Sequence, residues 1–567
     1  MSGPGDRAPK TLSPGEPTSF FHAEGQGRDP KRVGVDARLS PGSKSSARSH
    51  QASAREPGDL DEARPVMVSG RSAQQGKPQP GASVEKSDEV IVPKKSAKTR
   101  VTPVESMEGR TEAEGKSAAR NASSTLGEPE ALTFLQRIGE RAKQKPEEKW
   151  TNLLSHMRAP FLEEAYQRLR RDAAAGVDEV TWHEYGERLD ERLLDLQDRV
   201  HRGSYHPQPV RRVFIPKGNG KLRPLGIPAL EDKIVQQAAR MLLEPIYEAE
   251  FIGISYGFRP GKSQHDALDA LAEAIRRKVS WVLDADIEAF FDTIDHRHLQ
   301  AFLEHRIGDT RMVRLLMKWA KAGVMEEGKR HETDAGTPQG GIISPLMANL
   351  YLHYVLDLWV LSWRKKHASG EMYVVRYADD FVMGFQKEQD AMAMRRALAA
   401  RLAYFGLKLH PQKTRVIEFG RFARENRACR GLAKPETFDF LGFTHIAGIS
   451  REGKFQLKRR TSRKKRRAKL ARLKEECDRR RHQGVKEQYS WLKSVLRGHY
   501  RYYAVPTNHR ALAQFRRAVC FMWHRALQRR SQRARWTIPQ LQAFEARFPL
   551  PAPRILHPWP VARFALR

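Results

Sequence analysis

The chain has 567 residues, enough for two to four domains that each bury a core of their own. It carries 101 Lys and Arg against 67 Asp and Glu, a formal net charge of +34, so nucleic acid is the expected partner. The three widely spaced cysteines exclude a disulfide framework and a zinc module built on Cys pairs, and they are typical of a reducing, cytoplasmic compartment. No apolar run approaches the roughly 20 residues of a membrane-spanning helix, so we expect no membrane partner.

Composition and periodicity divide the chain into four regions. Residues 1–128 are rich in Gly, Ser, Pro, Lys and Glu, bury too little apolar surface to offset ordering, and are predicted to form a disordered basic tail. Residues 129–205 show helical periodicity, and residues 206–453 mix strand and helix patterns. From residue 454 to 567 strand patterns end and basic helices take over. The pattern predicts an α+β fold with helices on one side of an antiparallel sheet.

Strand patterns occur in two groups. Val210–Pro216 and Arg223–Pro228 read as the strands of a hairpin, with a glycine-containing turn between them. Trp281–Ile287, Met372–Ala378 and Phe381–Phe385 are apolar runs of strand length. The last two flank an acidic pair, which places that pair at the tip of a second hairpin.

Two acidic segments carry the chemistry. Asp379 and Asp380 are adjacent carboxylates, which repel one another unless they are hydrated in a turn or bind cations. Asp284 and Asp286 end an apolar strand and, by alternation, project from the same face. If this strand lies beside the hairpin, acids from both elements can hold two Mg²⁺ ions for an in-line displacement at phosphate.

These segments resemble known motifs. Tyr377-Ala-Asp-Asp is similar to the YxDD signature of reverse transcriptases, and Asp286-Ile-Glu-Ala-Phe-Phe-Asp resembles their first catalytic motif. More specifically, the chain is similar to the group II intron-encoded reverse transcriptase/maturase family over roughly Leu132–Trp559. The further segments that match in the family's order are Ile215–Pro228, Ser255–Ser263, Thr337–Pro345, Gly406–Thr414 and Phe440–Phe443, the last matching a primer-grip turn.

The resemblance implies a right-handed fingers–palm–thumb polymerase. Residues 129–205 would extend the fingers, residues 206–453 would form fingers and an antiparallel palm sheet, and residues 454–567 a helical thumb/maturase region. The implied activity is RNA-directed DNA synthesis, combined with assistance to splicing and retrohoming of a group II intron. The implied partners are intron RNA, an RNA template with a DNA primer, dNTPs and target DNA, and the implied cofactor is a pair of Mg²⁺ ions, with Mn²⁺ as an alternative.

The resemblance also assigns roles to residues. Asp286, Asp379 and Asp380 match the catalytic carboxylates, with Asp380 the weaker metal ligand, and the carbonyl of Ile287 matches a further ligand. In the nucleotide site, Lys217 and Arg223 would clamp the triphosphate. Phe290, one helical turn beyond Asp286, would block a ribose 2′-hydroxyl, while Phe291 fills the core. Gln339 would lie near the templating base pair, and Lys413 would protonate the leaving pyrophosphate.

The C-terminal region is strongly basic. Arg463, Lys464, Lys465, Arg466 and Arg467 are predicted to contact RNA phosphates. Leu496-Arg-Gly-His-Tyr-Arg-Tyr-Tyr resembles the centre of the maturase domain, which makes Arg497 and Arg501 candidate RNA contacts. The apolar positions before it, Trp491, Leu492, Val495 and Leu496, are predicted to be core.

Two other functions fit parts of the pattern. A splicing-only maturase would not need the intact acidic trio, and a reverse transcriptase of a defence or CRISPR system would not need the maturase-like segment. The sequence near His557 lacks the Cys pair or clustered His–Asn–His of a metal-dependent endonuclease, so we expect no DNA-cleaving domain.

Overall fold

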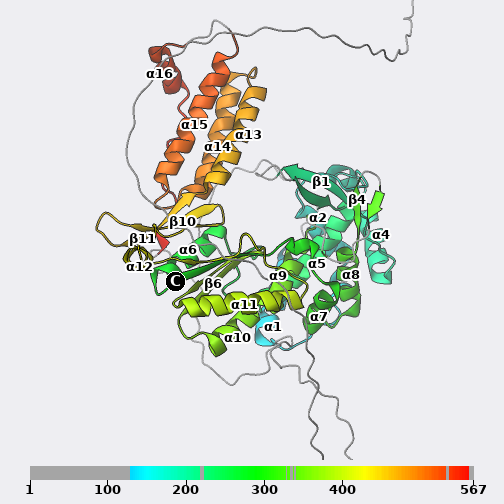
Figure 1. Cartoon of the computed structure of the whole chain (residues 1–567). Helices are drawn as coiled ribbons and strands as arrows, with labels where there is room; N and C mark the ends of the chain where they lie inside the picture. Colours follow the sequence, from blue (N-terminus) through cyan, green and yellow to red (C-terminus); the bar gives the residue numbers. More distant parts are fainter. Residues whose placement is uncertain are drawn as a thin grey trace, which may run out of the picture. The chain divides into compact units, whose positions relative to one another are not determined.

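The computed structural model describes residues 128–216, 222–326, 329–331, 336, 340–531 and 536–560, which all lie in one compact unit of the chain (Figure 1). The predicted tail lies outside the described residues except for its last residue. A capping box of Thr181 and Glu184 starts α3 (Trp182–Gly186), and Gly203, with φ of 80°, ends α4 (Leu189–Arg202). The first helices are α1 (Glu128–Gln144), α2 (Ala159–Gln167), α3 (Trp182–Gly186) and α4 (Leu189–Arg202), with a 3-10 turn η1 at Leu154–His156.

The predicted first hairpin is present. β1 (Val210–Pro216) and β2 (Leu222–Ile227) pair antiparallel. β4 (Val324–Glu326) adds to β1 in parallel, and β5 (Lys329–His331) pairs with β4, giving the strand order β2-β1-β4-β5. The predicted glycine turn of residues 217–221 lies outside the described residues.

The three predicted apolar strands lie side by side in a second sheet. β3 (Trp281–Asp286), β6 (Met372–Tyr377), β7 (Asp380–Phe385) and β8 (Arg415–Glu418) are antiparallel, in the order β6-β7-β3-β8. The acidic pair therefore sits at the β6–β7 connection, as the pattern indicates.

Helices cover both faces of this sheet, so the expectation of helices on one side is wrong. Leu283 of β3 packs in the core that includes α11 (Glu388–Tyr404), whereas Val282 packs in the cluster that includes α6 (Gln264–Arg276) (Figure 1). The strand carries apolar side chains on both of its faces, and each face needs cover. By alternation, Asp286 lies on the α6 face.

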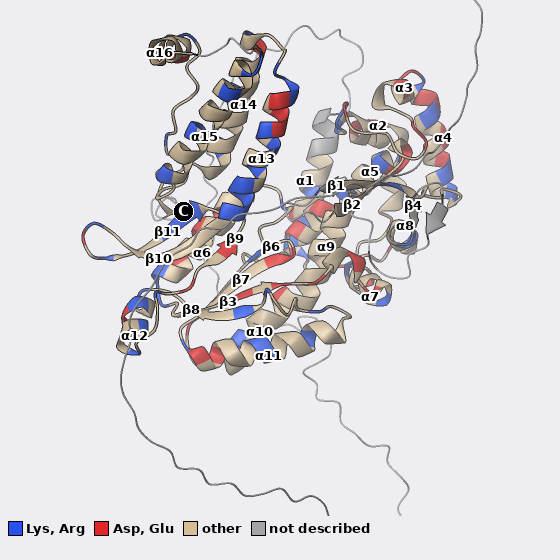
Figure 2. Cartoon of the chain, turned by 45° about the horizontal axis from the view of Figure 1, so that its top comes forward, with Lys and Arg blue, Asp and Glu red and all other residues tan. Residues whose placement is uncertain are grey.

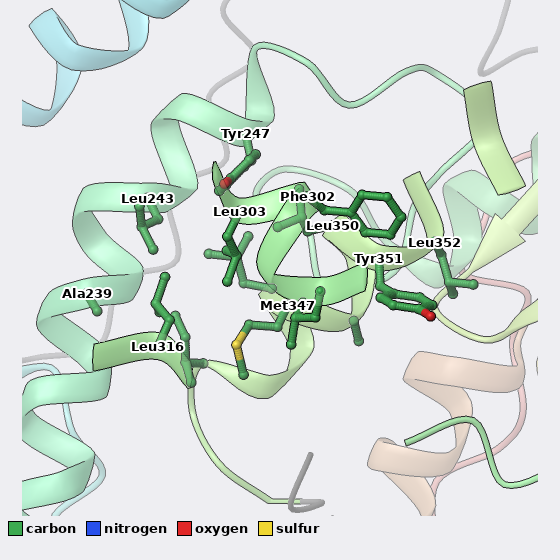
Figure 3. Packing of buried hydrophobic residues seen from close by; sticks show 14 of the residues in the cluster. Ala239, Leu243, Tyr247, Phe302, Leu303, Leu316, Met347, Leu350, Tyr351 and Leu352 are labelled. Carbon is green, nitrogen blue, oxygen red and sulfur yellow. The ribbon is translucent and has the colours of Figure 1, made fainter. Parts of the chain in front are cut away.

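The largest core lies among helices beside this sheet. Figure 3 shows Leu243 and Tyr247 of α5 (Leu230–Glu248) packing near Leu303 of α7 (His296–Arg306) and Met347 of α9 (Ser344–Leu352). α9 continues without a break into a π-helical segment, η3 (His353–Asp357), which contains the fully buried Asp357. The helices are α5 (Leu230–Glu248), α7 (His296–Arg306), α8 (Thr310–Ala320), α9 (Ser344–Leu352), η3 (His353–Asp357) and α10 (Leu358–His367), with the 3-10 turn η2 at Phe290–Asp292.

A third sheet follows α12 (Ala423–Cys429). β9 (Phe438–Phe440), β10 (Phe443–Ile449) and β11 (Phe455–Thr461) are ordered β11-β10-β9. Strand structure therefore continues past residue 454, and the expectation that it ends there is wrong: the expected boundary falls in the β10–β11 turn. Arg459 of β11 is buried and forms an ion pair with Asp269 of α6 at 2.7 Å, so this basic residue occupies an inward position of the strand with its charge paired.

Three long helices run side by side after β11 (Figures 1 and 2). Leu492 and Leu496 of the second helix are buried as predicted, and Trp491 and Val495 are partly buried against the same cluster. The helices are α13 (Arg463–Arg479), α14 (Val485–Tyr503) and α15 (His509–Gln528), followed by α16 (Ile538–Arg547). Within the described ranges, no helix combines the length and apolar character needed to cross a membrane.

Candidate active site

A two-residue turn, Ala378 and Asp379, joins β6 to β7. Tyr377 and Asp380 are the last pair of the ladder before it. Ala378 has φ of 58°, whereas Asp379 is not among the residues with positive φ, as in the type II′ turns that connect twisted antiparallel strands. Asp379 is thereby held at the tip of the hairpin.

Carboxylates of neighbouring strands meet at this end of the sheet. Asp380 stands opposite Asp286 in the β3–β7 ladder. Burial, together with the charges of Asp379, Asp284 and Asp286, raises the pKa of Asp380 to about 7. Burial also raises the pKa of Asp284 to about 6, although Arg415, 3.4 Å away, opposes the rise. The sheet end therefore concentrates negative charge that favours a bound cation.

Lys413 is a second basic side chain that contacts this cluster. Its ε-ammonium group forms an ion pair with Asp286. The backbone holds the two segments together, because Leu409 forms an isolated bridge with Ile287 and the N–H of His410 donates to the carbonyl of Asp286 at 2.8 Å. The Gly406–Thr414 motif thus lies beside the end of β3.

The donor set fits a hard divalent cation. Among the described residues, no three His, Cys, Asp or Glu side chains are arranged to enclose a metal ion. Mg²⁺ does not need such a cage, because it binds through one or two carboxylates and takes further oxygens from water and substrate phosphates. Asp286 already pairs with a cationic group, and its neighbours Asp379 and Asp380 add only oxygen donors. This set suits Mg²⁺ or Mn²⁺ better than a softer metal.

A buried charge network supports the turn. Arg376 and Asp357 are fully buried, and Nε and Nη2 of Arg376 donate to the two Asp357 oxygens at 2.7 and 2.5 Å. Nη1 of Arg376 donates to the carbonyl of Ala378 and to Oδ1 of Asn349, both at 3.0 Å. Asn349 in turn donates to the carbonyl of Gly257 at 2.6 Å. The sequence pattern did not predict this network. The one feature that could have indicated it is Arg376, a charged residue inside an apolar strand.

Gly257 packs directly against the turn. A Cβ at this position would lie 2.3 Å from the backbone nitrogen of Ala378, closer than any real contact. We expect Gly257→Ala to displace the turn and to lower the catalytic rate on the order of a hundredfold, because misplacement by about 1 Å has that effect on aligned groups. Single-turnover primer extension measures the change.

Gly253 offers a matched control in the same connection. Nothing lies within 4 Å of a Cβ built there, so Gly253→Ala should extend primers at the wild-type rate. Equal rates for Gly257→Ala and Gly253→Ala would show that the turn tolerates the extra methyl group.

The Phe440–Phe443 segment forms a second turn against the carboxylates. Leu441 and Gly442 have φ of 47° and 80°, as in a type I′ hairpin turn. The N–H of Leu441 donates to the Asp380 carboxylate, which opposes the rise in its pKa. The hydroxyl of Tyr502 in α14 donates to the Leu441 carbonyl at 2.8 Å. The C-terminal helices therefore contact the acidic site through one backbone turn.

The two phenylalanines after β3 are arranged differently from the prediction. Phe290 is 3% exposed and packs against Phe291 and Tyr351, whereas Phe291 is only partly buried. The expectation that Phe291 is the core residue of the pair is therefore wrong. Ala289 has φ of 45° and leads into a 3-10 turn, so the helical spacing assumed from Asp286 does not apply.

The remaining nucleotide-site predictions are only partly covered. Lys217 and Gln339 lie outside the described residues, and Arg223 is described only as backbone in β2. Next to Gln339, a Cβ on Gly340 would lie 2.3 Å from the carbonyl oxygen of Gly226, so Gly340 packs on β2. Sequence reasoning missed the buried Gln236, which accepts a hydrogen bond from the N–H of Ile342 at 2.8 Å and anchors the same loop.

The predicted RNA contacts at residues 463–467 open α13. Arg463, Lys464, Lys465 and Arg467 are exposed, and Arg466 donates to Gln514 at 2.8 Å. Figure 2 shows this concentration of basic residues at the beginning of the helix. A helix N-terminus carries positive partial charge, so cations there are unfavourable unless a polyanion binds.

Arg497 and Arg501 line a groove of 730 Å³ on α14. Lys493 of the same helix and Arg554 of the C-terminal segment add two more cations. The segment is fixed to the helices by hydrogen bonds, among them one from the Tyr500 hydroxyl to the Pro551 carbonyl at 3.0 Å. Four cations around one groove give it the character of an anion site.

Comparisons with known proteins agree with this geometry. Residues 215–445 match the family described as reverse transcriptase (RNA-dependent DNA polymerase). Group II intron-encoded protein LtrA of Lactococcus lactis subsp. cremoris is 39% identical over 240 residues, which cover 41% of this chain and 39% of that protein. The chain therefore contains a reverse transcriptase domain that is similar to those of group II intron-encoded proteins.

Two further relatives are similar to part of this chain. Protein YkfC of Escherichia coli (strain K12) is 41% identical over 239 residues, covering 37% of this chain and 62% of that protein. Nuclear intron maturase 4, mitochondrial, of Arabidopsis thaliana is 28% identical over 129 residues, covering 23% of this chain and 16% of that protein. The matches thus span less than two thirds of each of these relatives.

Proposed function

We propose that the protein is an RNA-directed DNA polymerase that also binds its group II intron RNA and assists splicing and retrohoming. The observation that carries the proposal is the pairing of Asp286 with Asp380 beside the Asp379 turn, inside the segment that matches reverse transcriptases. Relatives named as intron-encoded proteins and maturases support the intron function over a defence or CRISPR role. In this proposal the chain adopts the fingers–palm–thumb arrangement, with β3, β6, β7 and β8 as the palm.

The palm residues would act by two-metal nucleotidyl transfer. Asp286 and Asp379 would be the principal ligands of two Mg²⁺ ions, with Asp380 and the carbonyl of Ile287 as weaker partners. Bound Mg²⁺ would favour the deprotonated primer 3′-hydroxyl and stabilise charge on the leaving pyrophosphate. Lys413 pairs with Asp286 and carries a proton at Nζ, which it could give to the leaving group.

The nucleotide would be held by residues around this centre. Lys217 and Arg223 are proposed to bind the triphosphate, Phe290 to exclude a ribose 2′-hydroxyl, and Gln339 to lie near the templating base pair. The close packing of Gly340 on Gly226 supports a shared location for the Gln339 loop and β2. The incoming dNTP, the RNA template and the DNA primer would therefore meet at one end of the palm sheet.

Extension of oligo(dT) on poly(rA) by the purified protein tests the polymerase. We expect incorporation of dTTP with Mg²⁺ or Mn²⁺, no incorporation after chelation by EDTA, and recovery when Mg²⁺ is restored. Absence of extension in every metal would overturn the proposal. Splicing of the intron encoded around the reading frame, with and without protein, tests the maturase role separately.

The groove on α14 is proposed to bind intron RNA. We expect Arg497→Ala together with Arg501→Ala to weaken binding of that RNA by about tenfold and to reduce the salt dependence by roughly two phosphate contacts. The reason is that each arginine lines the groove and releases counterions when it contacts phosphate. Filter binding over a range of KCl concentrations measures both quantities.

The matched control removes the same charge from α10. Lys365 and Lys366 are exposed there, so Lys365→Ala together with Lys366→Ala should keep most of the affinity. A similar loss in both double variants would indicate that net charge, and not the groove, determines binding.

A further inference from the structure

Phe258 has an unusual backbone conformation for its residue type. Its φ is 57°, in the left-handed region, and its side chain is 49% exposed. A bulky residue is disfavoured in this region, and glycine is the residue that occupies it at no steric cost. Because the ring is exposed, its burial contributes little free energy to offset this strain, so stability of the fold does not explain a phenylalanine here.

The neighbours of Phe258 hold it in this conformation. The following residue, Arg259, is buried and forms an ion pair with Glu248 at 2.9 Å. Arg259 also donates to the carbonyls of Ile252 and Ser255, both at 2.8 Å. A strained backbone conformation persists where surrounding contacts fix it, and such conformations concentrate at functional sites.

The preceding residue places Phe258 beside the catalytic turn. Gly257 packs on Ala378, and its carbonyl accepts the hydrogen bond from Asn349. The Phe258 ring lies 6.4 Å from the ring of Tyr377, tilted by 43°. Tyr377 is the last residue of β6 before the turn that carries Asp379. An exposed aromatic ring is therefore fixed next to the candidate active site.

We infer that Phe258 is a nucleic-acid contact whose ring packs on a sugar of the template–primer duplex, or on an unpaired template base next to it, beside the catalytic turn. Bases stack on aromatic side chains whatever their sequence, which suits a polymerase that must accept any template. The inference rests on the proposed polymerase function, because that function supplies the duplex.

The test compares Phe258→Gly with Phe258→Tyr. Glycine removes the ring and suits the left-handed backbone, whereas tyrosine keeps an aromatic face. Fluorescence anisotropy with an RNA template–DNA primer duplex, without dNTPs, gives Kd, and thermal unfolding gives Tm. We expect Phe258→Gly to raise Kd about tenfold while Tm stays within about 2 °C of wild type, and Phe258→Tyr to bind like wild type.

Two further measurements separate a contact from a structural role. At saturating duplex, the single-turnover rate of Phe258→Gly should equal that of wild type, because the carboxylates are untouched. Phe422→Ala, which removes a ring that is 52% exposed just before α12, should keep the wild-type Kd. An unchanged Kd in Phe258→Gly, or a loss of rate at saturation without a change in Kd, would overturn the inference.

Failure of the inference is distinguishable from failure of the proposed function. A wild-type protein that extends primers, with a Phe258→Gly variant that binds the duplex normally, refutes the contact alone. A wild-type protein that does not extend primers, but binds the duplex through Phe258, refutes the polymerase and keeps the contact.

Discussion

Replacing Asp379 with asparagine is expected to lower the rate of RNA-templated primer extension by at least about a thousandfold. Asparagine keeps the size of the side chain but replaces a charged metal ligand with a neutral amide. The fold should be unharmed, since the change removes a negative charge that helps to raise the pKa of Asp380. Single-turnover incorporation of dTTP on poly(rA)/oligo(dT) measures the rate, and thermal unfolding and binding of intron RNA should match wild type.

Asp284 provides the control for this experiment. It lies on the same face of β3 as Asp286, but its carboxylate faces Arg415. Asp284→Asn should therefore cost less than about tenfold in rate, because it alters the field around the site without removing a ligand. Extension that survives in Asp379→Asn, or falls equally in Asp284→Asn, would refute the assignment of the palm ligands.

The carboxylate cluster could be predicted because its determinants are local. Two apolar runs around Asp379 and Asp380 leave room only for a tight turn, and strand alternation puts Asp284 and Asp286 on one face. These two steps use sequence neighbours and a period of two, and they hold in the structure. The pairing of β3 with β7 joins distant segments, so it enters the prediction only as a condition, which the structure meets.

Contacts between distant residues could not be predicted in this way. Lys413 forms an ion pair with Asp286, 127 positions earlier in the chain, and no local sequence pattern predicts which carboxylate a lysine will pair with. β11 could not be predicted because Arg459 points inward in it, and the Asp269 partner that makes this possible lies 190 positions earlier. Tertiary packing determines each of these features.

The buried network under the turn leads to the second large effect. Arg376→Met should lower the free energy of unfolding by about 3–5 kcal/mol, because it leaves the Asp357 carboxylate fully buried without its partner. The same change removes the hydrogen bond to the carbonyl of Ala378, so extension should also fall. Chemical denaturation measures the stability, and primer extension at a temperature where the variant is folded measures the activity.

The double variant Arg376→Met with Asp357→Leu separates these two losses. With no lone charge left in the core, most of the stability should return, as apolar replacements of buried ion pairs commonly allow. The carbonyl of Ala378 still lacks its donor, so extension should stay at least about tenfold below wild type. Arg376→Lys completes the set, because one ammonium group cannot serve Asp357, Asn349 and the turn together. If extension instead rises in step with stability across the three variants, Arg376 acts on the fold alone and does not position Asp379.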